Sequence, residues 1–213
     1  MPKEREAHAK TEVQLDRRLR ADAQRNEDAV LEAAKAVFAE LGVDAPVRDV
    51  AMRAGVGMGT LYRRFPKRAD LIAGVFRREV DACAAEAQRL TETCLPLDAL
   101  TRWLQQYSGF IGTKRGLSAA LHSGDPAFDT LPDYFRTKFE PALVGLLNKA
   151  ADAGEIRRHL DAIDLLRAIG NLSVATENGG AEHTKRMIDL LVDGLRFGRA
   201  NGADKSDAQP APE

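Results

Sequence analysis

The most informative stretch of the chain runs from Val47 to Phe65 and reads Val-Arg-Asp-Val-Ala-Met-Arg-Ala-Gly-Val-Gly-Met-Gly-Thr-Leu-Tyr-Arg-Arg-Phe. Two helices that cross steeply over a short turn need a small residue where their backbones approach, and a turn residue that tolerates a left-handed conformation. Ala51 meets the first need, Gly55 follows four positions later, and Leu61 is a large aliphatic residue ten positions after Ala51. This spacing predicts a helix-turn-helix over about 46–65, with helices near 47–54 and 58–64.

The segments on both sides of this stretch also have helical periodicity. In residues 26–41, apolar side chains recur at steps of three and four from Val30 to Leu41, and Gly42 follows as a stop signal. Further helices are expected near 67–90, 97–112, 116–122, 130–153, 161–177 and 182–198. No convincing alternating strand is present, so the sequence predicts an all-α protein.

Positive charge is concentrated in and after the predicted helix-turn-helix. The whole chain has a formal net charge of -1, which by itself argues for no partner. Between Ala45 and Arg78, however, there are two acidic residues, Asp49 and Asp70, and eight basic ones: Arg48, Arg53, Arg63, Arg64, Lys67, Arg68, Arg77 and Arg78. Such a local excess attracts the phosphates of a nucleic acid.

Several classes of protein are not supported by the sequence. No apolar run reaches the roughly 18 residues that a membrane span needs, and the first residues are charged, so a cytoplasmic protein is expected. Cys83 and Cys94 form no Cys-x-x-Cys pair, and the four histidines share no metal-ligand spacing. No combination of nucleophile, base and orienting group stands out. We therefore expect no enzyme, no metal and no cofactor.

Three motifs together resemble the TetR (tetracycline-repressor-like) family of bacterial regulators. They are Val37-Phe38-Ala39-Glu40-Leu41-Gly42, then Val50-Ala51-x-x-Ala54-Gly55-Val56, then Gly59-Thr60-Leu61-Tyr62-Arg63-Arg64-Phe65-Pro66-x-Arg68-x-x-Leu71. The resemblance covers about residues 26–80. It implies an N-terminal three-helix DNA-binding unit containing the helix-turn-helix, a fourth connecting helix, a C-terminal helical bundle domain for ligand binding and dimerisation, and double-stranded DNA as a partner.

Carried over residue by residue, the resemblance identifies candidate DNA contacts. Arg48 opens the supporting helix, Arg68 stands at the start of the fourth helix, and the recognition helix carries Thr60, Tyr62, Arg63 and Arg64. Arg63 is the candidate for reading a guanine edge. The chain departs from the family at Gly57 and Met58, where a serine and a lysine are common. This departure removes a capping hydroxyl and one cation.

The C-terminal part offers a candidate ligand pocket. Trp103, Tyr107 and Phe110 fall on one stripe of the 97–112 helix, which indicates either ordinary core packing or the wall of a pocket. The polar candidates that would join such a wall are Ser118, His122 and Asn171. This lining favours a small-molecule effector that is largely apolar or aromatic.

The last two predicted helices are amphipathic and are expected to form the interface of a homodimer. The candidate interface residues are Leu166, Ile169, Gly170, Ser173, Ile188, Leu191 and Leu195. Small residues such as Gly170 and Ser173 would allow helices to approach closely. Two helices from each subunit would then form a four-helix bundle.

The predicted organisation is a flexible or partly helical charged arm at 1–24, a DNA-binding domain at 25–85, a ligand-binding and dimerisation domain at 86–199, and a disordered tail at 200–213. The function predicted from these features is a ligand-responsive transcriptional regulator, a repressor released from a palindromic operator by a small molecule. One alternative is a small-molecule-binding or enzymatic helical protein with a vestigial helix-turn-helix. Another is an architectural DNA-binding protein without a ligand pocket.

Overall fold

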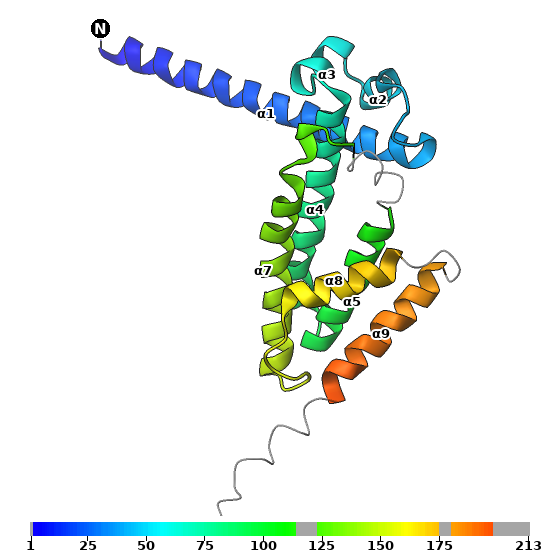
Figure 1. The fold of residues 1–213 in the computed structure, drawn as a ribbon. Helices are drawn as coiled ribbons and strands as arrows, with labels where there is room; N and C mark the ends of the chain where they lie inside the picture. Colours follow the sequence, from blue (N-terminus) through cyan, green and yellow to red (C-terminus); the bar gives the residue numbers. More distant parts are fainter. Residues whose placement is uncertain (1, 114–122, 175–179, 198–213) are drawn as a thin grey trace, which may run out of the picture. The chain divides into compact units, whose positions relative to one another are not determined.

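The structure, a computed structural model, describes residues 2–113, 123–174 and 180–197, and within these ranges it contains helices and no strand. The all-α prediction is confirmed. Figure 1 shows the helices, which are α1 (Pro2–Leu41), α2 (Val47–Ala54), α3 (Met58–Arg64), α4 (Arg68–Thr93), α5 (Pro96–Thr113), the 3-10 helix η1 (Pro126–Phe128), α7 (Leu131–Asp152), α8 (Ala162–Val174) and α9 (Gly180–Phe197).

The helices of the predicted helix-turn-helix begin and end where the sequence indicated. The largest difference lies at α1, which was expected over 26–41 but begins at Pro2. Residues 3–25 are rich in alanine, glutamate, lysine and arginine and contain no glycine or proline, so local helix propensity is high where no apolar stripe exists. The segment predicted as a flexible or partly helical arm is therefore the first part of α1. The predicted 116–122 helix and the 200–213 tail lie outside the described residues.

The chain divides into two compact units, and the division falls inside α4. Unit 1 comprises Met1–Arg78 with Ser123–Phe128, and unit 2 comprises Glu79–His122 with Asp129–Glu213. The sequence placed its domain boundary later in α4, after residue 85. Since α4 continues from Arg68 to Thr93, each unit contains part of the same helix.

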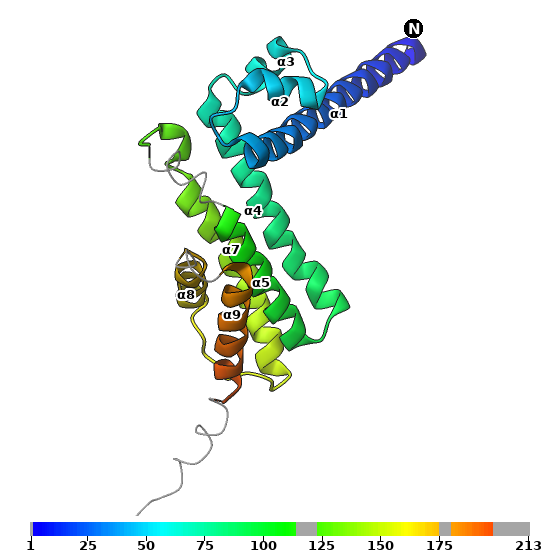
Figure 2. The ribbon, with the colours of Figure 1, turned by 90° about the vertical axis from the view of Figure 1, so that its right-hand side faces the viewer.

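Unit 1 has a small apolar core built by α1, α2, α3 and the first part of α4. Figure 2 shows α2 and α3 lying against α1. Leu61 of α3 is almost completely buried in this core, and Phe65 is also buried. A Cβ atom added at Gly74 would lie 3.0 Å from side-chain atoms of both Leu31 and Phe65. Glycine at this position therefore lets α4 approach the core closely.

Unit 2 is organised around α5, which contacts α7, α8 and α9. Trp103 of α5 is completely buried, and its indole Nε1 donates a hydrogen bond to the backbone oxygen of Cys83 on α4 at 2.8 Å. Tyr134 of α7 donates from its hydroxyl to Asp81 of α4 at 2.7 Å, and Lys138 of α7 pairs with the same carboxylate at 2.9 Å. These contacts tie α5 and α7 to the second part of α4.

Candidate functional site

The turn between α2 and α3 has the geometry that the sequence predicted. Gly55 has φ of 67° and ψ of 25°, the left-handed conformation that glycine adopts without strain. Its N–H donates to the Met52 oxygen at 3.2 Å, and the N–H of Val56 donates to the Ala51 oxygen at 3.1 Å. These bonds satisfy carbonyl groups at the end of α2. The short turn then positions α3 to begin at Met58.

No side chain caps the start of α3. Gly57 is the N-cap residue and offers only its backbone oxygen, which accepts from the N–H groups of Thr60 and Leu61 at 3.0 and 3.1 Å. The structure thus has no capping hydroxyl at this position, as expected from the departure at Gly57. Met58, the first residue of α3, is exposed.

Tyr62, Arg63 and Arg64 follow one another on α3, and all three side chains are exposed. Tyr62 keeps 49% of its surface accessible, because Leu61 takes the inward position. Arg63 folds back along its own helix, and its Nε donates to the Gly59 oxygen at 3.1 Å. A side chain held only by this bond on the surface can extend toward a ligand at little cost.

Two of the candidate arginines have acidic neighbours. Arg64 pairs with Glu27 of α1 at 2.6 Å. Arg48 at the start of α2 has 79% of its side chain exposed, and its Nε lies 3.6 Å from an oxygen of Asp49. Arg48 therefore has the less restrained guanidinium of the two.

Arg68 has contacts that the sequence did not indicate. This half-buried side chain donates from Nε to the Val43 oxygen at 3.2 Å and from Nη2 to the Ala45 oxygen. Both acceptors lie in the loop between α1 and α2. The guanidinium that was predicted to face a phosphate therefore connects this loop to the start of α4. At the same helix start, the Asp70 carboxylate accepts a hydrogen bond from the Lys67 N–H at 2.9 Å.

A further ion pair within unit 1 reduces the charge available on α2. Arg53 forms a two-pronged interaction with Glu40 of α1, at 2.7 and 2.8 Å. The hydrogen bond from Arg53 lowers the pKa of the Glu40 carboxyl below its usual value, and the positive charge adds to this effect. Arg53 contributed to the basic excess seen in the sequence, but here it joins α2 to α1.

A groove of about 500 Å³ in unit 1 lies between α1 and α3. Its α1 side includes Arg20, Gln24 and Glu27, and its α3 side includes Thr60 and Arg63. Thr60 is half-buried at this groove. The candidates on α3 therefore have different surroundings: Tyr62 lies on an exposed surface, and Thr60 lies in the partly enclosed groove.

The aromatic stripe of α5 packs against α7 in unit 2. The rings of Trp103 and Tyr107 stack with their centroids 5.6 Å apart, and Phe139 lies edge-on to Tyr107 at 5.1 Å. Phe110 is half-buried and lies 6.1 Å from Phe135 and 5.5 Å from Phe139. The cluster is therefore largely a packed core.

A cavity of about 440 Å³ lies beside this cluster, and we name it the aromatic cavity. Its lining includes Tyr107, Phe135 and Phe139, and its polar side chains are Asn171, Arg136 and Arg167. Burial raises the pKa of the Tyr107 hydroxyl to about 12. Trp103 does not line this cavity, so the structure places that candidate in the core; Ser118 and His122 lie outside the described residues.

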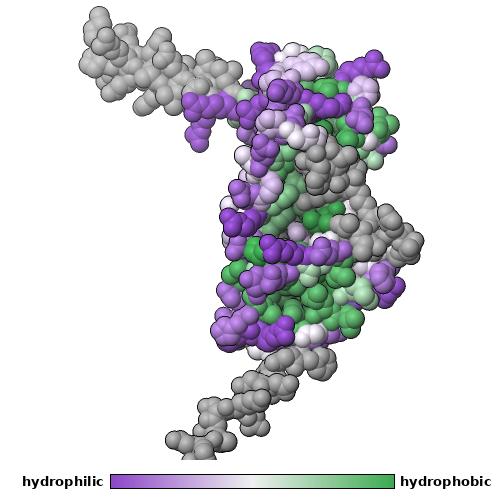
Figure 3. Space-filling view, in the orientation of Figure 1, coloured by the Kyte–Doolittle hydropathy of each residue, from purple (hydrophilic) through white to green (hydrophobic). Residues whose placement is uncertain are grey.

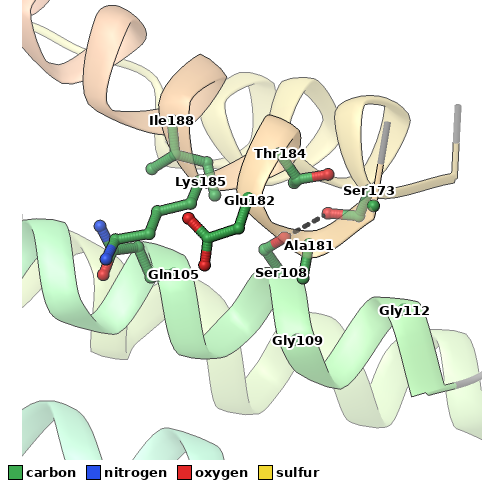
Figure 4. A pocket seen from close by; sticks show the side chains of 11 residues that line it. Gln105, Ser108, Gly109, Gly112, Ser173, Ala181, Glu182, Thr184, Lys185 and Ile188 are labelled. Atoms are coloured by element: carbon green, nitrogen blue, oxygen red, sulfur yellow. Dashed lines mark hydrogen bonds between the residues drawn. The ribbon is translucent and has the colours of Figure 1, made fainter. Parts of the chain in front are cut away.

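A second cavity in unit 2, which we name the polar cavity, has a volume of about 520 Å³ and is lined by α5, α8 and α9. Figure 4 shows its side chains, which include Gln105, Ser108, Ser173, Glu182, Thr184 and Lys185. The sequence analysis missed this site because its residues come from three helices far apart in the chain. Only Ser173 and Ile188 had been singled out, both for a different role.

The predicted dimer interface stays a prediction, and most of its residues are already covered in the single subunit. The described residues bury Leu166, Ile169, Ser173, Ile188 and Leu195 within the subunit itself. These side chains pack against neighbouring helices, so little of their surface is open in a single subunit.

The surface left on α8 and α9 is different. Gly170 and Leu191 are partly exposed, and Leu190, which the sequence did not select, is 64% exposed. Figure 3 shows hydrophobic surface on the part of unit 2 where α9 lies. Any contact between subunits through α9 would involve this face.

Within the described ranges, no group of three His, Cys, Asp or Glu side chains could hold a metal ion. None of the described helices combines the length and the apolar character needed to cross a membrane.

Both parts of the chain match known families. Residues 30–75 match the family described as bacterial regulatory proteins, tetR family, and residues 95–197 match the family described as transcriptional regulator SbtR-like, C-terminal domain. The HTH-type transcriptional repressor LfrR of Mycolicibacterium smegmatis is 37% identical over 79 residues, which are 37% of this chain and 41% of that repressor. The chain therefore matches less than half the length of this curated relative.

Two solved structures match most of the chain. A TetR transcriptional regulator from Streptomyces coelicolor is 33% identical, with 80% of this chain and 98% of that one covered and a TM-score of 0.67. A TetR transcription regulatory protein from Mycobacterium vanbaalenii is 30% identical, with 84% and 99% covered and a TM-score of 0.62. Both matches extend over the two units.

Proposed function

Because this chain belongs to the TetR family of bacterial regulatory proteins, we propose that it is a transcriptional regulator that binds a palindromic DNA operator as a homodimer and releases it when a small molecule binds to unit 2. The output we propose is repression. The proposed activity is binding alone, and no catalytic residue is assigned.

The observation that carries the proposal is the exposed face of α3. Tyr62, Arg63 and Arg64 point away from a core that holds Leu61, and a glycine turn fixes the helix that carries them. An exposed tyrosine and two exposed arginines on one short helix supply both stacking or hydrogen-bonding groups and cations for phosphates. We assign contacts with the duplex to these three residues and to Arg48, Thr60 and Arg68, with Arg63 reading a base edge.

In the proposed dimer, the exposed apolar face of α9 around Leu190 pairs with its counterpart. Leu190 is a large apolar side chain at a position where the subunit itself provides no cover. Dimers of helix-turn-helix proteins place their recognition helices in successive major grooves, roughly 34–36 Å apart. A two-fold symmetric protein then requires a palindromic operator.

The aromatic cavity is the proposed effector site, and an apolar or aromatic compound is the proposed ligand. Phe135 and Phe139 provide apolar contact, while Asn171 offers a hydrogen bond. A ligand that separates α5 from α7 would also displace Tyr134, which holds Asp81 of α4. Since α4 continues to Arg68, which fastens the loop before α2, this movement would change the DNA-bound arrangement of unit 1.

Selection of bound fragments from the host genome tests this function. The parent protein should enrich a palindromic sequence. Its affinity should fall steeply as the salt concentration rises, because its basic side chains displace counterions from the phosphates of the duplex. A Tyr62→Ala, Arg63→Ala variant that folds as the parent does should enrich nothing. If this variant selects the same fragments as tightly, α3 is not the DNA-binding surface; if the parent enriches none, the helix-turn-helix is vestigial.

A further inference from the structure

All the buried serine and threonine side chains in the described part of the chain line the polar cavity. They are Ser108 on α5, Ser173 on α8 and Thr184 on α9, and none exposes more than 7% of its surface. Burying hydroxyl groups costs free energy unless they are hydrogen-bonded, and apolar side chains pack helices together without that requirement. The concentration of buried hydroxyls in one place indicates a site for a polar ligand.

The hydrogen bond between Ser108 and Ser173 leaves acceptor capacity on Ser108. The Ser173 hydroxyl lies 2.7 Å from the Ile169 oxygen and 2.9 Å from the Ser108 hydroxyl, as drawn in Figure 4. One hydroxyl carries one proton. When Ser173 donates to Ile169, Ser108 donates to Ser173, and the lone pairs of Ser108 remain available to accept from a ligand.

Thr184 provides an independent observation. This side chain is 5% exposed and lines the cavity, yet among the described residues its hydroxyl has no hydrogen-bond partner. Because no fully buried side-chain oxygen or nitrogen in the described ranges lacks a partner, the Thr184 hydroxyl oxygen keeps some surface accessible to solvent. A ligand in the cavity can take the place of solvent at this hydroxyl.

The mouth of the cavity carries one charge of each sign. Glu182 and Lys185 extend from α9 toward α5 in Figure 4, and neither belongs to an ion pair within the described ranges. Gln105 donates from Nε2 to Asp189 at 2.9 Å, so its amide oxygen can accept a further bond. Opposite charges over buried hydroxyls suit a small molecule that itself carries both charges.

We propose that the polar cavity binds a small zwitterion of the amino-acid type. Its ammonium group pairs with Glu182, its carboxylate pairs with Lys185, and its polar substituent reaches the hydroxyls of Ser108 and Thr184. This site is separate from the aromatic cavity and differs from it in ligand chemistry. The inference adds a second ligand to the proposed regulator and does not depend on DNA binding.

Two glycine positions provide a matched test of the site. Gly109 lines the polar cavity on α5, and a Cβ atom added there meets nothing within 4 Å, so Gly109→Leu would fill the cavity without a backbone clash. Gly145 on α7 is equally open, is exposed and does not line the cavity. Gly145→Leu is therefore the control for adding a leucine to a helix surface.

The twenty proteinogenic amino acids, tested one at a time by calorimetry on the full chain, are the probes. At least one should bind the parent and Gly145→Leu equally and should not bind Gly109→Leu. Thr184→Val and Ser108→Ala should each weaken binding by about tenfold, the usual effect of removing one buried hydrogen-bond partner. Melting temperatures measured without probe identify any variant that fails to fold.

Two results would overturn the proposal: no amino acid binds the parent at millimolar concentration, or an amino acid binds Gly109→Leu as well as it binds the parent. Neither result affects the selection of genomic fragments. Failure of the polar cavity is thus distinguishable from failure of the DNA-binding function.

Discussion

Replacing Arg68 should weaken the fold of unit 1 as well as its binding to DNA. The guanidinium donates to the backbone oxygens of Val43 and Ala45, and Ala45 is buried. A hydrogen bond from a charged donor contributes about 1.5–3 kcal/mol. Because Arg68 is half-exposed and water can replace part of the missing bonding, we expect Arg68→Ala to lower the free energy of unfolding by about 2 kcal/mol in total.

The measurement is urea unfolding followed by far-ultraviolet circular dichroism, with Arg48→Ala as the matched control. Arg48 is a highly exposed arginine of the same unit, so its removal should change the free energy of unfolding by less than about 0.5 kcal/mol. Arg48→Ala should instead reduce the dependence of log affinity on log salt by about 0.9 for each phosphate that the protein no longer neutralises.

A third variant separates the shape of the Arg68 side chain from its charge. Arg68→Lys keeps the charge but cannot reach two carbonyl oxygens as a planar fork does. It should therefore remain less stable than the parent. If Arg68→Ala and Arg68→Lys both unfold at the same urea concentration as the parent, the loop-fastening role of Arg68 is wrong.

Three further predictions concern a turn, a buried hydroxyl and the surface of α9. Gly55→Ala should lower the free energy of unfolding by about 1–2 kcal/mol, because alanine is strained at positive φ; an unchanged urea midpoint would contradict this. Tyr107 keeps its proton to about pH 12 in the fold but releases it near pH 10 when unfolded, so the stability of the parent should fall as the pH rises above 10. In urea titrations across this range, Tyr107→Phe should lose less stability than the parent. Leu190→Asp should yield monomers in analytical ultracentrifugation with the fold intact, whereas Leu95→Asp, at an equally exposed leucine between α4 and α5, should stay dimeric.

The helix-turn-helix was predictable because its determinants are local. Gly55 fixes the turn through its own backbone conformation, and Ala51 and Leu61 are close enough in sequence for their spacing to specify two helices. The position of Leu61 also predicts the direction of Tyr62, since adjacent residues on a helix point to different sides. Both the bounds of α2 and α3 and the exposure of Tyr62 follow from this short stretch.

The interior of unit 2 was less predictable because it depends on which helix covers which face. The amphipathic pattern of α8 and α9 indicated an apolar stripe but not its partner, and Ile169 and Ile188 bury that stripe inside the subunit. Trp103 was ambiguous between core and pocket wall for the same reason. The polar cavity needed tertiary structure altogether, because Ser108 and Thr184 meet only when α5 and α9 are in place.

Cleavage of bound DNA by a reagent attached at the start of α3 tests the central claim most directly. Cys83 is buried and Cys94 is partly exposed, so a Cys94→Ser, Met58→Cys protein presents one accessible thiol for an iron chelate. We predict cuts at two places in the bound operator, roughly 34–36 Å apart, one for each recognition helix. Stable complexes that show no more cutting than those of the Cys94→Ser protein would contradict the placement of α3 in the major groove.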